Sequence, residues 1–231
     1  MDSHFHIYEI DKFPEQVGQF PTPDYGPILY RNVPIDLYLE QIKNTPIHGA
    51  LFVQCANSCL AEASKILLLL GYGIRIENPG AGPPFEICDV DTQHIMNYED
   101  GDTFLLSGET HEGLSLLEKE NVPIDLPLVR PRQWLAAPDV ASKFPNLKIV
   151  IDHCGKPPIK NGGSVEWEKS MQLLAKHPNV YIKLSGLETT CDYNNWSSED
   201  LKPYVEKVIS WFGPERCMFG SDWPVSLLAA K

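Results

Sequence analysis

Short apolar runs alternate with amphipathic stretches along most of this chain. The apolar runs predict buried strands at residues 49–54, 122–129, 147–152, 179–184 and 216–220. The amphipathic stretches predict helices at residues 37–43, 60–70, 112–120, 167–176 and 201–212. Strands that alternate with helices in this way are typical of parallel βα units.

One short phrase recurs in front of two of the predicted strands. Phe-Pro-Asn-Leu stands at residues 144–147, and His-Pro-Asn-Val stands at residues 177–180. Each phrase joins the end of a predicted helix to a predicted strand. The recurrence therefore favours a repeated βα unit.

Residues 71–91 break this alternation, because glycine and proline are dense there. Weak strand character remains at residues 72–76 and 85–90, with no room for a full helix between them. Proline and glycine both oppose helix formation. We therefore expect an irregular loop or a distorted strand over 71–91.

Composition limits the classes of protein to which the chain can belong. At 231 residues, with 43% hydrophobic and 22% charged residues, it fits one globular domain over residues 1–231. Its formal net charge of −12 opposes binding to nucleic acids or anionic membranes. No apolar run reaches the length of a membrane span, and no secretory signal is visible, so we expect a cytoplasmic protein.

The six cysteines are scattered and form no Cys-x-x-Cys pair. This spacing predicts no zinc knuckle and favours reduced thiols. Cys55 and Cys154 are expected to pack as small apolar side chains near strand ends, and neither is favoured as a nucleophile.

The chemistry-bearing residues at the two ends of the sequence are the most informative. His4 and His6 alternate along a predicted strand, so they share one face with Asp2, and Asp222 follows the last predicted strand. Two imidazoles and a distant carboxylate suit a divalent metal or an activated water. The alternative is that the histidines are ordinary surface or core residues and that Asp222 initiates a turn.

Further polar fragments, most of which follow predicted strands, together resemble a known family. The fragments are Asp-Ser-His-Phe-His at 2–6, Gln-His at 93–94, Val-Arg-Pro-Arg-Gln at 129–133, Asp-His-Cys-Gly-Lys-Pro-Pro at 152–158, Lys-Leu-Ser-Gly-Leu at 183–187 and Gly-Ser-Asp-Trp-Pro-Val at 220–225. This set resembles the amidohydrolase superfamily, in the amidohydrolase-related branch that holds L-fucono- and L-rhamnono-lactonases and 2-pyrone-4,6-dicarboxylate lactonase. The resemblance implies a (β/α)8 TIM barrel with its site at the carboxyl ends of the strands.

The chain departs from that branch in three places. Residues 71–91 are shorter than the branch's third βα unit, and Thr92-Gln93-His94 lacks the arginine of the usual Val-Arg-His. The family also continues into a final helix, whereas this sequence stops at Lys231. The resemblance therefore predicts an incomplete barrel, with a disrupted third unit and no final helix.

The resemblance implies lactone hydrolysis, most simply of a sugar-acid lactone. Asp222 would act as the general base toward water. His153 would polarise the carbonyl or orient the water, and the alternative is a packed histidine held by Asp152. One zinc or manganese ion held by His4, His6 and Asp222 is an expectation of the same resemblance, and a metal-free site is the alternative.

Four further residues are expected to bind a small-molecule substrate. Arg130 and Lys156 would hold its carboxylate or hydroxyls, His94 would contact it, and Trp223 would wall the pocket. The alternative for the two cations is a structural ion pair, which is the reading favoured for Arg132. Two other functions stay open: a metal-dependent decarboxylase of the same superfamily, and a truncated relative without catalysis. The sequence also leaves open a homo-oligomer.

Overall fold

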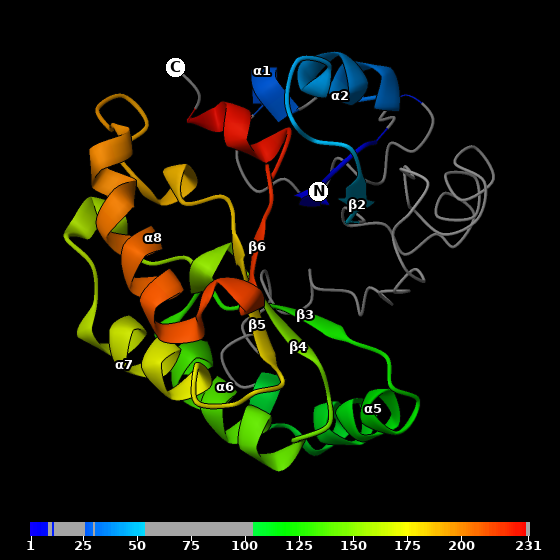
Figure 1. Cartoon of the computed structure of the whole chain (residues 1–231), viewed down its shortest axis with the longest axis vertical. Coiled ribbons are helices and arrows are strands. Elements are labelled where there is room, and N and C mark those ends of the chain that lie inside the picture. The colour runs from blue at the N-terminus through cyan, green and yellow to red at the C-terminus, as the bar shows by residue number, and fades with distance from the viewer. Residues whose placement is uncertain (9–10, 12–25, 30, 54–103, 230–231) are drawn as a thin grey trace. The chain divides into compact units, whose positions relative to one another are not determined.

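The computed structural model describes residues 1–8, 11, 26–29, 31–53 and 104–229 (Figure 1). Its contacts divide the chain into two compact units. The first unit joins the two ends of the sequence, Met1–Phe85 and Phe219–Lys231. The second unit is Glu86–Met218.

The first unit is built on two parallel strands. Strand β1 (Asp2–Phe5) pairs with β2 (Ala50–Phe52), and Phe5 also forms a parallel bridge with Trp223. Helix α1 (Gly26–Leu29), helix α2 (Ile35–Ile42) and the 3₁₀ helix η9 (Val225–Leu228) belong to this unit. The buried core consists of Phe5, Ile7, Tyr8, Val33, Tyr38, Ala50 and Trp223.

The second unit contains a four-stranded sheet in the order β3-β4-β5-β6. Its strands are β3 (Ile124–Pro127), β4 (Ile149–Asp152), β5 (Val180–Leu184) and β6 (Cys217–Phe219). The ladders from β3 to β4 and from β4 to β5 are parallel. Chain order and sheet order therefore coincide, as expected for successive βα units.

Four helices connect and cover these strands. They are α5 (Gly108–Lys119), α6 (Pro131–Lys143), α7 (Val165–Leu174) and α8 (Ser198–Phe212). Short 3₁₀ helices lie between them: η4 (Phe104–Leu106), η5 (His153–Gly155), η6 (Ile159–Asn161), η7 (Glu188–Thr190) and η8 (Pro214–Arg216). Figure 1 shows α6, α7 and α8 following one another along the sheet.

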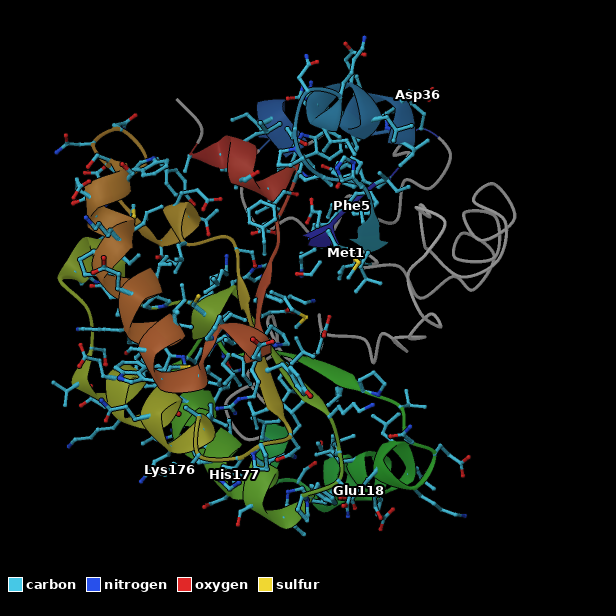
Figure 2. The ribbon with its side chains drawn as sticks, viewed as in Figure 1. Met1, Phe5, Asp36, Glu118, Lys176 and His177 are labelled. Atoms are coloured by element: carbon cyan, nitrogen blue, oxygen red, sulfur yellow. The ribbon has the colours of Figure 1, made fainter. Side chains whose placement is uncertain are left out.

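Side-chain burial explains why the sheet is parallel and covered. Every residue of β3 and β4 is buried, as is typical of parallel strands with both faces covered. Trp167 and Met171 from α7 are fully buried in the same cluster as Ile149 and Ile151 of β4. The connection from α7 to β5 stays at the surface, where Figure 2 labels Lys176 and His177.

Five of the predicted strands are present, and their ends agree within a few residues. The predicted helices at 37–43, 112–120, 167–176 and 201–212 correspond to α2, α5, α7 and α8. Helix α6 was not predicted, because Pro131 and Pro138 both argue against a helix. Pro131 occupies the first helical turn, where no N–H is needed, and buried Trp134 and Val140 stabilise the rest through packing.

The parallel sheets agree with the α/β barrel class only in part. Within the described residues the strands form two separate parallel sheets and no closed barrel. The predicted helix at 60–70, the irregular segment 71–91 and His94 lie outside those residues. The disrupted third unit, the missing final helix and the single domain therefore stay predictions. No described helix has the length and apolar character needed to cross a membrane.

Candidate metal and catalytic site

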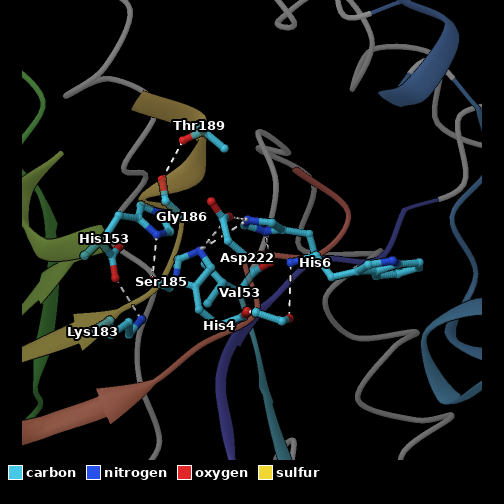
Figure 3. A network of polar contacts seen from close by, with 12 residues as sticks. His4, His6, Val53, His153, Lys183, Ser185, Gly186, Thr189 and Asp222 are labelled. Carbon is cyan, nitrogen blue, oxygen red and sulfur yellow. Dashed lines mark hydrogen bonds and ion pairs between the residues drawn. The ribbon is translucent and has the colours of Figure 1, made fainter. Parts of the chain in front are cut away.

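Strand β1 and the residue that follows it bring two imidazoles together in the first unit. His4 is almost completely buried, and its Nε2 lies 3.2 Å from Nε2 of His6 (Figure 3). The two rings meet edge to face, with 4.8 Å between their centroids. Their spacing of two residues places both on one side of the extended backbone, as the sequence predicted.

Asp222 completes this cluster from the other end of the chain. Its Oδ1 lies 3.6 Å from Nε2 of His6 and 3.9 Å from Nε2 of His4. The backbone N–H of Asp222 donates to the carbonyl of His4, at 2.8 Å. Asp222 has a positive φ of 52°, a conformation that a non-glycine residue rarely adopts and that is frequent at functional sites.

The orientation of His6 is fixed by the backbone of the segment after β2. Nδ1 of His6 lies 2.8 Å from the carbonyl oxygen of Val53. A carbonyl can only accept, so Nδ1 of His6 donates to it, and Nε2 of the same ring faces Asp222 and His4. In metal sites, a histidine ligand is oriented in the same way, because the ring nitrogen that does not bind the metal donates to a carbonyl or carboxylate.

The three groups suit one divalent metal ion. The Nε2 atoms of His4 and His6 and an oxygen of Asp222 all lie within 4.8 Å of one another. Ligands about 2.0–2.2 Å from a tetrahedral zinc ion are separated from one another by roughly 3.3–3.5 Å. The observed separations of 3.2, 3.6 and 3.9 Å are close to that value. Nitrogen and carboxylate ligands also match the donor types that zinc prefers.

A buried carboxylate connects the two chain segments that carry these ligands. Asp2 is fully buried, and its Oδ1 accepts from the backbone N–H groups of His4 and Ser221, at 3.0 and 2.8 Å. Its Oδ2 accepts from the hydroxyl of Tyr38, at 2.8 Å. Sequence reasoning placed Asp2 on the same face as the histidines but gave it no role.

The second unit holds the other predicted catalytic residue, His153, just after β4. Nδ1 of His153 lies 2.9 Å from the hydroxyl oxygen of Ser185, which follows β5. Asp152 instead forms an ion pair with Lys183 at 2.9 Å. Ser185 therefore contacts the imidazole of His153 (Figure 3), and the choice between a catalytic and a packed His153 stays a prediction.

The loop that carries His153 has an unusual backbone. Four successive residues, at 153–156, have positive φ values of 50°, 54°, 68° and 47°. Two buried indoles hold this loop: Trp167 donates to the carbonyl of Cys154 at 2.7 Å, and Trp134 donates to that of Gly155 at 2.8 Å. Such strained segments persist only where their surroundings hold them, and they are common at functional sites.

Lys183 belongs to a motif that the sequence analysis singled out, but sequence reasoning gave its charge no role. It is fully buried in the sheet, 2.5 Å from Asp125 on β3 and 2.9 Å from Asp152 on β4. Burial alone would lower the pKa of Lys183, but the carboxylates of Asp152 and Asp125 outweigh it and raise the pKa. The available signal was a lysine and two aspartates at inward positions of neighbouring strands.

The predicted substrate-binding residues that the structure describes lie in different environments from one another. Lys156 donates to the hydroxyl of Thr189 at 2.7 Å and to the carbonyl of Gly186 at 3.4 Å. Arg130 is half-buried at the start of α6, and Arg132 is exposed. Trp223 is buried in the core of the first unit, with its ring 5.6 Å from that of Tyr38. Their roles in binding substrate stay predictions.

The described cysteines agree with a packing role. Cys154, Cys191 and Cys217 are free thiols. Cys154 is fully buried, and burial raises the pKa of its thiol to about 12. A thiol with so high a pKa is a poor nucleophile, because the thiolate is the reactive form.

Parallel βα units with polar residues after their strands define an α/β protein. The sequence profile of the amidohydrolase family matches residues 90–231, and the chain belongs to that family of hydrolases. A crystal structure of an amidohydrolase from Burkholderia multivorans with bound zinc covers all of this chain, with a TM-score of 0.78 and 24% identity, and the chain covers 86% of it. At that identity the likeness concerns the fold.

Two lactonases are among the similar sequences. An L-fucono-1,5-lactonase from Burkholderia ambifaria is 50% identical over 105 residues, which are 44% of this chain and 35% of that enzyme. An L-rhamnono-gamma-lactonase from Scheffersomyces stipitis is 24% identical over 296 aligned positions, which cover all of this chain and 86% of that enzyme. The chain thus spans about a third of the first relative and most of the second.

Proposed function

We propose that this chain hydrolyses the lactone of a sugar acid, with His4, His6 and Asp222 at the centre of the reaction. The observation that carries the proposal is the cluster of two imidazole Nε2 atoms and one carboxylate oxygen, separated by 3.2–3.9 Å. The named activities of two relatives, L-fucono-1,5-lactonase and L-rhamnono-gamma-lactonase, support lactones as the substrate class.

The proposed step is attack of water on the ring carbonyl. The oxygen of the water bonds to the carbonyl carbon, and Asp222 accepts one proton from that water. The ester bond between that carbon and the ring oxygen then breaks, and the ring oxygen receives a proton. The product is an open-chain hydroxy acid, and water is the only co-reactant.

The residues of the cluster would also hold one divalent ion, zinc or manganese. When bound, such an ion supplies Lewis-acid polarisation and lowers the pKa of water. The histidines would be its neutral ligands, and the contact from Val53 would keep His6 in the required tautomer. The bound zinc of the amidohydrolase from Burkholderia multivorans supports this part of the proposal.

The remaining predicted residues are proposed to bind and polarise the substrate. His153 would donate to the carbonyl oxygen, since its Nδ1 is engaged with Ser185 and the ring is thereby oriented. Arg130 and Lys156 would hold hydroxyl or carboxylate groups of the sugar acid. His94 and Trp223 complete the proposed set.

The test is acid release from L-fucono-1,5-lactone and L-rhamnono-gamma-lactone at neutral pH. Asp222→Asn keeps the shape of the side chain but removes its capacity as a base, so turnover should fall by about 10²–10⁴-fold or more. Asp36→Asn is the matched control, because Asp36 is an exposed carboxylate on α2 in the same unit (Figure 2).

Turnover of Asp222→Asn within a few-fold of the unaltered chain would remove the proposed mechanism. Release of carbon dioxide from an acid substrate, with no lactone opened, would replace it by the decarboxylase alternative. A folded chain that turns over neither substrate class would favour the non-catalytic relative.

A further inference from the structure

Asp2 lies where the two ligand-bearing segments of the first unit meet. Ser221 and Asp2 are separated by 219 positions in the sequence, yet the backbone N–H of Ser221 donates to Asp2 Oδ1 at 2.8 Å. The same oxygen accepts from the N–H of His4, at 3.0 Å. One carboxylate oxygen therefore ties the backbone of a histidine in the cluster to the residue that precedes Asp222.

The other oxygen of Asp2 is held by Tyr38 of α2. The Tyr38 hydroxyl donates to Oδ2 at 2.8 Å, and its ring stacks on Phe5 with 4.0 Å between centroids. Burial and the neighbouring negative charge of Asp2 raise the pKa of Tyr38, so the hydroxyl stays protonated and remains a donor. Helix α2 is thereby linked to the ligand segments through one hydrogen bond.

These contacts have two consequences for a cation in the cluster. Three donors fix the position of the carboxylate, which in turn fixes where the backbones of His4 and Asp222 approach each other. All three donors are neutral groups, so none of them cancels the negative charge of Asp2. In a buried setting a nearby negative charge favours a cation more strongly than it would in water.

We propose that Asp2 is a positioning residue for the metal site, and that Tyr38 orients it. Asp2 touches no ligand atom of the ion in this arrangement. It acts through the backbone of His4 and Ser221 and through its charge, and so sets the affinity of the His4–His6–Asp222 cluster for a divalent cation. The proposal rests on the metal site of the proposed function.

The test measures zinc affinity and requires no catalysis. The full chain and its variants are stripped of metal, and zinc dissociation constants are measured by competition with a chromophoric chelator. Asp2→Asn keeps an oxygen that can accept from both backbone N–H groups but removes the charge. Removing an outer partner of a metal ligand weakens binding by about 10–100-fold, and we expect that range for Asp2→Asn and about tenfold for Tyr38→Phe.

Tyr8→Phe is the matched control for Tyr38→Phe. Tyr8 is equally buried in the same core, and its hydroxyl donates to the carbonyl of Leu29 at 2.8 Å, so the control removes a comparable hydrogen bond that does not involve Asp2. We expect Tyr8→Phe to keep the zinc affinity of the unaltered chain. Asp36→Asn serves in the same way for Asp2→Asn.

Zinc affinity unchanged in Asp2→Asn would overturn the proposal, whatever Tyr38→Phe does. If Asp2→Asn does not fold, Tyr38→Phe decides: a loss beyond that of Tyr8→Phe supports the proposal, and an equal affinity overturns it. An unaltered chain that binds no zinc would overturn the metal site itself, and this inference with it. Normal zinc binding with no response to Asp2→Asn overturns the inference alone.

Discussion

The two units bury carboxylates in different ways. In the first unit, Asp2 is surrounded by two backbone N–H groups and the hydroxyl of Tyr38, all neutral donors. In the second unit, Asp125 and Asp152 receive the ammonium group of Lys183, which lies fully inside the sheet. One unit solvates a negative charge with dipoles, and the other neutralises it with a cation from the chain.

This difference predicts that the first unit binds a cation and that the buried charges of the second unit stabilise its sheet. A carboxylate held by neutral donors keeps its charge available to an external cation, and the first unit contains the cluster of His4, His6 and Asp222. The ion pairs of Lys183 instead connect β3, β4 and β5 and support the strand that leads into His153. We therefore expect substitutions of Asp2 to change metal binding and substitutions of Lys183 to change stability.

The largest expected effect on stability is that of Lys183→Met. The variant leaves two buried carboxylates without their cation, and breaking a buried pair by removing one partner typically costs about 3–5 kcal/mol. Denaturant unfolding of the full chain measures this as a lower free energy of unfolding. The zinc affinity of any folded fraction should stay close to that of the unaltered chain.

Lys207→Met is the matched control for that substitution. Lys207 pairs with Glu168 on the surface, where both side chains are more than a third exposed. Exposed pairs contribute about 0–1 kcal/mol, so little loss is expected. Equal losses for the two lysine variants would contradict the structural role assigned to Lys183.

A smaller effect is expected from Tyr38 in alkaline solution. The pKa of Tyr38 is raised in the folded chain by burial and by Asp2, above the value of about 10 that an unfolded tyrosine has. The folded state then binds more protons than the unfolded state once the pH exceeds about 10, and stability falls as the pH rises. The stability contributed by this group is fully present below that pH.

Tyr38→Phe removes this titration. The pKa of Lys183 is also raised, so Lys183 still lowers the stability of the variant as the pH rises. Free energies of unfolding measured from pH about 8 to 11 should therefore fall less steeply for Tyr38→Phe than for the unaltered chain. Identical slopes would show that Tyr38 is not held protonated by its surroundings.

The sequence predicted the strands of the second unit, but it did not predict the contacts between them. Strand periodicity and apolar runs located β3, β4, β5 and β6, because these signals are local. Helix α6 was missed because two prolines obscure a helix that packing stabilises through Trp134 and its buried neighbours. The partners of Lys183 depend on strand register, which local patterns do not specify.

The candidate site shows the same limit. Alternation along the predicted first strand placed His4 and His6 on one face, and their residue types joined them to Asp222 in a metal or water-activating site. The contact between Asp2 and Ser221 joins opposite ends of the sequence, and the positive φ of Asp222 is a conformation that its residue type does not predict. Both depend on the folded arrangement of the first unit.

Anomalous diffraction at the zinc absorption edge tests the central claim most directly. Crystals of the full chain grown with one equivalent of zinc should show one strong peak within ligand distance, about 2.0–2.2 Å, of Nε2 of His4, Nε2 of His6 and an oxygen of Asp222. A strong peak at other residues, with these three side chains in direct contact and no ion among them, would contradict the account.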